Sequence, residues 1–282
     1  MSGPWTSSHP ETFRAILADA LDKDAYICVP SARQVFFGPA PTGTRTIWGT
    51  MPHYGVYWGP MRYHVRRLPD RWMVTLTLAV HPPNASSRLE LPDCKLRDRM
   101  EGTTECTGIA YAESATRDAC PDTGAFYAPA TRRNVDERVA RWSTEAEAYY
   151  NRDAALFGIP VTYDFEIVAA HEGRQVPGAD DTIPLEPSCA RTPYFNGLRA
   201  GWSLPVVSHE LGHYLGLIDE YEMFSGIVDS YPKTPFPGAE VSRMGLSMKE
   251  DTRFLPLHHY LILRRYFCPQ PQSRDPYHDA LP

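Results

Sequence analysis

The chain has 282 residues, of which 43% are hydrophobic and 12% aromatic, which excludes a disordered protein and allows a substantial core. The formal net charge is −6 and the lysine and arginine residues are scattered, which excludes the basic surface that nucleic acid requires. No apolar stretch reaches the roughly 18 residues that a membrane-spanning helix needs, so we expect no membrane span.

The first part of the sequence predicts one helix followed by strands. Residues 11–21 place apolar side chains at helical spacing, which indicates an opening helix. Residues 25–37, 45–65 and 71–81 are rich in Val, Ile, Thr, Tyr and Trp and are interrupted by Gly and Pro, which is typical of strands joined by turns. A long irregular segment with cysteines follows at residues 82–129. We therefore predict a β-rich N-terminal region with a cysteine-containing loop over residues 1–125, whose role the sequence leaves open.

The cysteines indicate an oxidising environment. There are six, at positions 28, 94, 106, 120, 189 and 268, and three of them lie in a polar segment where no core requires them. We expect disulfides, with a local loop closed among Cys94, Cys106 and Cys120. The alternative is a set of reduced cysteines in a cytosolic protein.

The expected location follows from the cysteines and from the first residues. The start of the chain lacks the charged and apolar regions of a secretory signal. We expect a protein that is secreted or delivered outside the producing cytoplasm. Its route would be a longer parent polypeptide or dedicated delivery machinery of the kind that bacterial effector toxins use.

The second part of the sequence predicts helices and strands in alternation. Residues 134–157 have apolar side chains at a period of about 3.6, typical of a long amphipathic helix, and residues 161–170 alternate as a strand does. Residues 204–217 predict a buried helix, residues 224–239 a loop and residues 253–267 a closing helix. These elements define a second predicted domain over residues 126–282, to whose sheet residues 71–81 can add a strand.

The predicted helix over residues 204–217 contains His209 and His213, with Glu210 beside the first. Each helical residue advances by about 100°, so histidines at i and i+4 lie on one face and can bind one metal ion. A zinc ion held by few protein ligands keeps a position for water, whose pKa it lowers to about 7. Glu210 can take a proton from that water and pass it to a leaving amine. The alternative is an ordinary amphipathic helix with hydrogen-bonded core histidines.

A third ligand is expected after this helix. On a continuous helix Asp219 would face away from the histidines, whereas Gly216 can adopt a left-handed conformation that ends the helix and turns Asp219 back. Glu220 is the rival, because it would share their face if the helix continued. We expect Asp219, and the further alternatives are Glu222, Glu240, Glu250 and His258.

The run from His209 to Asp219 resembles the zinc-binding signature of the metzincin metallopeptidases, His-Glu-x-x-His-x-x-Gly-x-x-His/Asp, in the aspartate form of the snapalysin-like branch. The Asp-Glu-Tyr ending after Gly-Leu-Ile also resembles the bacterial IgA-peptidase family. This resemblance implies His209, His213 and Asp219 as zinc ligands and Glu210 as general base. It also implies a methionine-containing turn beneath the metal, for which Ser242-Arg243-Met244-Gly245 is the best match, although Met244 can equally be a core residue.

The fold that the resemblance implies is an α+β, zincin-like catalytic domain over residues 126–282. It consists of a mixed sheet, a backing helix, the active-site helix and the methionine turn. One exposed edge strand of such a sheet binds an extended substrate, and residues 161–170 and 182–185 are the candidates. Tyr221 and Tyr260 are candidate donors to an oxyanion, with packing as the alternative for each.

The predicted function is a zinc-dependent endopeptidase with one catalytic ion and a protein or peptide substrate. We expect it to be used as an exported bacterial effector or toxin. The alternative is a non-catalytic protein-binding module with a structural metal site.

Overall fold

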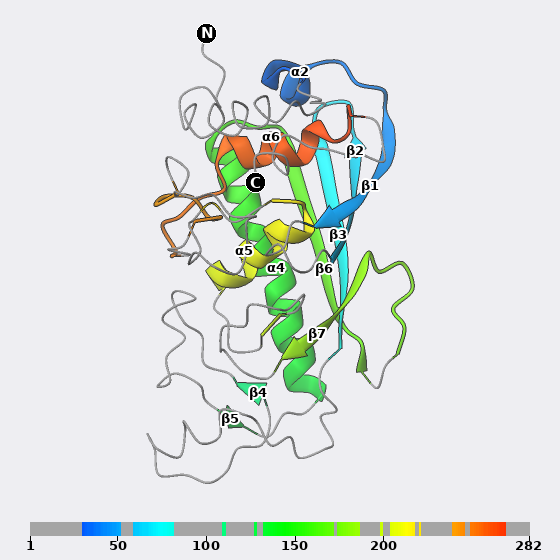
Figure 1. The fold of residues 1–282 in the computed structure, drawn as a ribbon, viewed down its shortest axis with the longest axis vertical. Coiled ribbons are helices and arrows are strands. Elements are labelled where there is room, and N and C mark those ends of the chain that lie inside the picture. The colour runs from blue at the N-terminus through cyan, green and yellow to red at the C-terminus, as the bar shows by residue number, and fades with distance from the viewer. Residues whose placement is uncertain are drawn as a thin grey trace, which may run out of the picture.

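The computed structural model describes residues 30–51, 59–81, 109–110, 127–128, 132–171, 174–186, 198–199, 204–217, 220, 239–245 and 249–268. They form an α+β fold in which helices pack against a mixed sheet (Figure 1), so the predicted class is confirmed. The helices are α2 (Ala32–Phe37), α4 (Arg132–Leu156), α5 (Leu204–Tyr214) and α6 (Pro256–Arg264). Among the described helices, none combines the length and the apolar composition needed to span a bilayer.

One six-stranded sheet is built around a central strand, β3. Its strands are β1 (Gly43–Met51), β2 (Gly59–Arg67), β3 (Trp72–His81), β6 (Val161–Ala169), β7 (Asp181–Glu186) and β8 (Leu198–Arg199). β1, β2 and β3 are antiparallel neighbours, whereas β6 and β7 run parallel to β3 and β8 runs parallel to β7. Because β6 pairs along one edge of β3, β2 and β7 share its other edge. β4 (Ile109–Ala110) and β5 (Tyr127–Ala128) form a separate pair.

Helix α4 makes the crossover between two parallel strands. Parallel neighbours such as β3 and β6 need a long connection, and α4 lies between them in the sequence and packs on β6. The prediction that residues 71–81 and 161–170 belong to one sheet is therefore confirmed. Since β1–β3 and β6–β8 share this sheet, the boundary predicted between residues 125 and 126 separates strands of the same sheet.

The core lies between the sheet and its helices. Alternate residues of β3 are buried, as its run of β-branched and aromatic residues favours. Tyr63 on β2 donates its hydroxyl proton to the carbonyl of Ile262 at 3.0 Å, and the Tyr163 hydroxyl on β6 lies 2.7 Å from Nδ1 of His259. Both partners are on α6, so these two contacts hold α6 against strands β2 and β6.

The strand predicted at residues 25–37 is wrong over its described part. Ala32–Phe37 form helix α2, and Ser31 caps it by accepting a hydrogen bond from the backbone N–H of Gln34 at 3.1 Å. A serine before a helical segment satisfies one of its free N–H groups, and here that cap outweighs the β-propensity of Val35 and Phe36. The helix predicted at residues 11–21 lies outside the described residues.

Side chains of helix α4 form hydrogen bonds with the backbone at the outer edge of β6. The backbone N–H groups of β6 that point away from β3 donate to acceptors one helical turn apart: Tyr163 to Asn151 at 2.8 Å, Phe165 to Glu147 at 3.0 Å, and Ile167 to Ser143 at 2.7 Å. Asn151 also donates to the carbonyl of Tyr163 at 3.0 Å. These groups are not available to a substrate strand, so the prediction of residues 161–170 as the substrate-binding edge is wrong. Residues 182–185 stay a prediction for that role.

Candidate metal centre

Helix α5 carries the predicted metal-binding residues in a buried position. His209, Glu210 and His213 are all buried, at 0%, 5% and 3% exposure. The helix is held in place from α4, where the Tyr150 hydroxyl donates to the carbonyl of Ser208 at 2.7 Å. The two imidazole rings lie next to each other, with ring centres 4.9 Å apart and planes at 90°. The two rings, one helical turn apart, therefore lie on the same side of α5 and close to each other.

Each imidazole is oriented by a main-chain carbonyl. Nδ1 of His209 lies 2.8 Å from the carbonyl oxygen of Arg243, and Nδ1 of His213 lies 2.8 Å from that of Leu217. A carbonyl oxygen can only accept, so each Nδ1 carries the proton and each neutral ring keeps its lone pair on Nε2. This is the tautomer that a metal-binding histidine adopts when a carbonyl orients it. The donor set of these two residues therefore fits zinc.

Glu210 lies beside one of the nitrogens that are predicted to bind the metal. Its Oε2 atom is 4.0 Å from Nε2 of His213. Tyr214, one turn further along the helix, is buried, and burial followed by the negative charges of Asp181 and Glu210 raises the pKa of its phenol well above the usual value. The phenol therefore keeps its proton at neutral pH, and the sequence motif does not identify this residue.

Gly216 ends the helix in the way the sequence predicts. Its φ is +82°, in the left-handed region, and α5 stops at Tyr214. The Leu217 N–H donates to the carbonyl of Gly212 at 2.9 Å, and the Gly216 N–H donates to that of His213 at 2.8 Å, which is the Schellman pattern. The prediction of a chain reversal at Gly216 is confirmed. Asp219 and Tyr221, which follow it, lie outside the described residues, so their roles stay predictions.

The predicted methionine turn lies directly against α5. Met244 is fully buried, and a Cβ added to Gly212 would stand 2.7 Å from its Sδ atom. The carbonyl of Met244 accepts the N–H of Glu220 at 3.0 Å. A Cβ added to Gly245 would stand 1.8 Å from the carbonyl oxygen of Ala239, so only glycine fits there. The turn therefore contacts helix α5 through the Met244 side chain. Through a backbone hydrogen bond it also binds Glu220, which follows that helix in the sequence.

Several alternative ligands are engaged elsewhere. Nδ1 of His258 accepts the N–H of Leu255 at 2.9 Å, so its proton is on Nε2, which lies 2.8 Å from Oε1 of Glu220. Glu250 accepts the hydroxyl proton of Tyr149, and Glu240 is exposed. Glu222 lies outside the described residues. Within the described ranges, no group of three or more His, Cys, Asp and Glu side chains could hold a metal ion.

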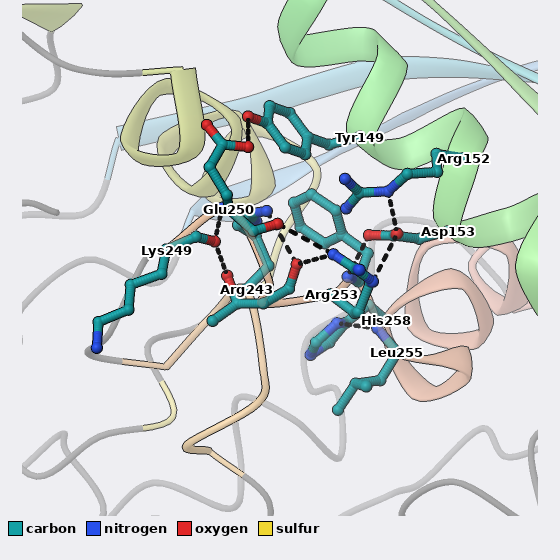
Figure 2. Close-up of polar contacts among 11 residues, drawn as sticks. Tyr149, Arg152, Asp153, Arg243, Lys249, Glu250, Arg253, Leu255 and His258 are labelled. Atoms are coloured by element: carbon teal, nitrogen blue, oxygen red, sulfur yellow. Dashed lines mark hydrogen bonds and ion pairs between the residues drawn. The ribbon is translucent and has the colours of Figure 1, made fainter. Parts of the chain in front are cut away.

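A polar network supports the turn from α4 and from the segment before α6 (Figure 2). The Arg243 guanidinium donates to the carbonyls of Lys249 and Thr252, each at 2.9 Å, and lies 4.4 Å from the ring centre of Tyr149. Burial, partly offset by nearby negative groups, lowers the pKa of Arg243 to about 10, so it remains a cation at neutral pH. Asp153 on α4 accepts the N–H of Phe254 at 2.8 Å, which ties α4 to the segment before α6.

The second candidate oxyanion donor is directed to another part of the chain. The Tyr260 hydroxyl donates to the carbonyl of Pro30 at 2.6 Å, which joins α6 to the residue before the Ser31 cap. This contact serves packing between α6 and the N-terminal side of α2.

Sequence reasoning missed the two arginines that contact the turns of this centre. Arg265 donates to the carbonyls of Leu215 at 3.1 Å and Gly216 at 3.1 Å, at the end of α5. Arg243 belongs to the predicted turn, but only its neighbour Met244 is part of the family pattern. Arg265 binds main-chain oxygens of a segment distant in sequence, whereas Arg243 binds those of residues six and nine positions further along the chain. A main-chain oxygen is present at every residue, so no local pattern predicts either contact.

Comparison with known protein families, characterised proteins and solved structures gives no match.

Proposed function

We propose that this chain is a zinc-dependent endopeptidase in which His209, His213 and Asp219 hold the ion and Glu210 is the general base. One observation carries the proposal. The two imidazoles donate Nδ1–H to carbonyls, so Nε2 is the nitrogen of each ring that would bind a metal, and the Glu210 carboxylate lies 4.0 Å from one of these Nε2 atoms. The order of crossover helix, strand and motif helix supports a zincin-like domain.

Bound zinc would polarise the scissile carbonyl and lower the pKa of a water molecule. The Glu210 carboxylate would accept a proton from the attacking water and donate it to the nitrogen of the leaving amine. His209 and His213, fixed by their carbonyl partners, would hold their Nε2 atoms in place without reorganising. The buried position of all three side chains excludes bulk water and strengthens their electrostatic interactions.

The setting that we propose is outside the producing cytoplasm, as an exported effector or toxin acting on a protein or peptide. The six cysteines, of which Cys268 lies among the described residues, support an oxidising environment. The other five cysteines predicted to form disulfides lie outside the described residues, so their pairing stays a prediction.

A non-catalytic binding module with a structural metal is the competing proposal, and Glu210 distinguishes the two. A structural site needs closed coordination and no carboxylate placed to take a proton. The test is Glu210→Gln, measured by cleavage of fluorescently labelled casein, zinc content and melting temperature. We expect unchanged zinc content and melting temperature, and a loss of activity of about 10²- to 10⁴-fold, the contribution typical of a general base.

Glu240→Gln is the matched control, because Glu240 is an exposed glutamate on the described segment before the turn. It should cleave casein at the parent rate. A Glu210→Gln variant as active as the parent would contradict the proposed base and favour the binding module.

A further inference from the structure

Two buried guanidinium groups lie behind the two imidazoles, one for each ring. Arg243 is 0% exposed and Arg265 is 3% exposed. A buried cation is costly unless strong hydrogen bonds compensate for lost water. Each guanidinium donates hydrogen bonds to two main-chain carbonyls. Those of Arg265 belong to the turn that ends α5, and those of Arg243 belong to the segment before α6. Two costly groups with these partners call for an explanation in what the segments that they hold do.

Arg243 fixes the carbonyl that orients His209. Its guanidinium holds the carbonyls of Lys249 and Thr252, and its own N–H donates to the carbonyl of Arg253 at 2.7 Å. The residue is thus fastened through both its side chain and its backbone. Its carbonyl, which receives the Nδ1–H of His209, cannot move without breaking these bonds.

Arg265 has the corresponding place behind His213. It holds the carbonyls of Leu215 and Gly216, and the next residue, Leu217, supplies the carbonyl that receives the Nδ1–H of His213. A Cβ added to Gly216 would stand 1.7 Å from Nη1 of Arg265, so guanidinium and turn are in close contact. The cation also offsets the partial negative charge at the C-terminus of α5.

We propose that Arg243 and Arg265 are positioning residues of the zinc site, each fixing the carbonyl that orients one ligand histidine. This inference rests on the proposed function. Residues that orient metal ligands typically contribute about 10- to 100-fold to metal affinity. Lysine keeps the positive charge of arginine but cannot hold two carbonyls in a planar fork, so Arg→Lys separates positioning from charge.

The experiment compares Arg243→Lys and Arg265→Lys with the parent and with Tyr266→Phe. The control removes the hydroxyl that donates to the carbonyl of Pro41 at 2.6 Å, next to Arg265 but away from both turns. Zinc affinity is measured by competition with a chromophoric chelator, and the cobalt-substituted protein gives a d–d absorption band that reports ligand geometry. Circular dichroism establishes the temperature at which each variant is fully folded.

We expect both lysine variants, measured where they are folded, to bind zinc about 10- to 100-fold more weakly and to show an altered cobalt band. Tyr266→Phe should lower the melting temperature but keep the parent affinity and band. If a lysine variant does not fold, Tyr149→Leu tests Arg243 and Met61→Leu tests Arg265, because each removes one contact of the guanidinium. Each should weaken zinc binding several-fold.

Two outcomes overturn the inference, and they differ in what else they overturn. If the parent binds zinc and the folded arginine-site variants match its affinity and cobalt band, the arginines serve stability alone and the proposed function stands. If the parent binds no zinc, the proposed function fails together with the inference.

Discussion

The Met244 sulfur lies so close to Gly212 that a Cβ on that glycine would stand 2.7 Å from Sδ. Met244 is fully buried, so a shift of its side chain would disturb the packed core around it. The glycine inside the His-Glu-x-x-His motif is therefore explained by the approach of the turn, and the two segments that make the candidate centre pack as one unit.

This contact predicts strong coupling between two substitutions. Gly→Ala inside a helix normally stabilises by about 1 kcal/mol, but here we expect Gly212→Ala to destabilise by about 1–3 kcal/mol through overpacking. Met244→Ala should cost about 2–5 kcal/mol. The double variant should be more stable than the sum of the two predicts, by about 0.5–3 kcal/mol, because the space left by Met244 accepts the new methyl group. Urea unfolding of all four proteins measures this, and additive effects would contradict the contact.

The two helix ends that share the Schellman pattern offer a matched pair of glycines. Gly158 ends α4 with a φ of +65° and Gly216 ends α5 with a φ of +82°, but an added Cβ meets nothing within 4 Å at Gly158 and meets Arg265 at Gly216. Gly158→Ala should cost about 1 kcal/mol, the strain of a left-handed alanine. Gly216→Ala should cost clearly more and also weaken zinc binding. Equal losses of stability, with zinc affinity unchanged in both, would show that the turn at Gly216 has no special role.

The hydrogen bonds from α4 to the outer edge of β6 can be removed by a substitution that should lower stability without lowering catalysis. Asn151→Ala removes the partner of both the N–H and the carbonyl of Tyr163, and we expect about 1–3 kcal/mol of destabilisation from each group left unsatisfied. Glu145→Ala is the control on the same helix, because its exposed pair with Arg141 should contribute at most about 0.5 kcal/mol. For the proposed cleavage reaction, the kcat and KM of the folded Asn151→Ala variant should equal those of the parent. A raised KM would show that substrate binds at this edge after all.

Buried His259 predicts a dependence of stability on pH. Burial, and secondarily the neighbouring His258, lowers the pKa of His259 from 6.5 to about 3 in the folded protein. Between these values the unfolded chain binds more protons than the folded one, so stability is full above pH 6.5 and falls as the pH drops toward 3. His259→Gln should flatten this slope by an amount on the order of 1 kcal/mol per pH unit. Urea unfolding from pH 7 to pH 4 checks it, and an unchanged slope would argue against a neutral His259.

The elements that could be predicted from the sequence are those that depend on local patterns. The apolar spacing of α5 and the glycine that ends it lie within a few residues of each other, so both the helix and its reversal were predictable. α2 was missed because Val35 and Phe36 favour a strand when taken alone, whereas the Ser31 cap decides the conformation.

The contacts that could not be predicted join distant segments. The Ser143, Glu147 and Asn151 side chains replace a neighbouring strand, and this role exists only once β6 has become an edge beside α4. Arg265 and its carbonyl partner Leu215 are 50 residues apart. Every residue has a main-chain carbonyl, so the residue types do not indicate which carbonyl will accept a hydrogen bond. Asp219 remains a prediction from motif and turn geometry.

The most direct test of the account is anomalous scattering at the zinc edge from crystals of protein purified without chelator. The account predicts one strong peak at about 2.0–2.1 Å from Nε2 of both His209 and His213, with a carboxylate oxygen of Asp219 completing the ligand set. The absence of a peak at these rings, or a peak held by other residues, would contradict it.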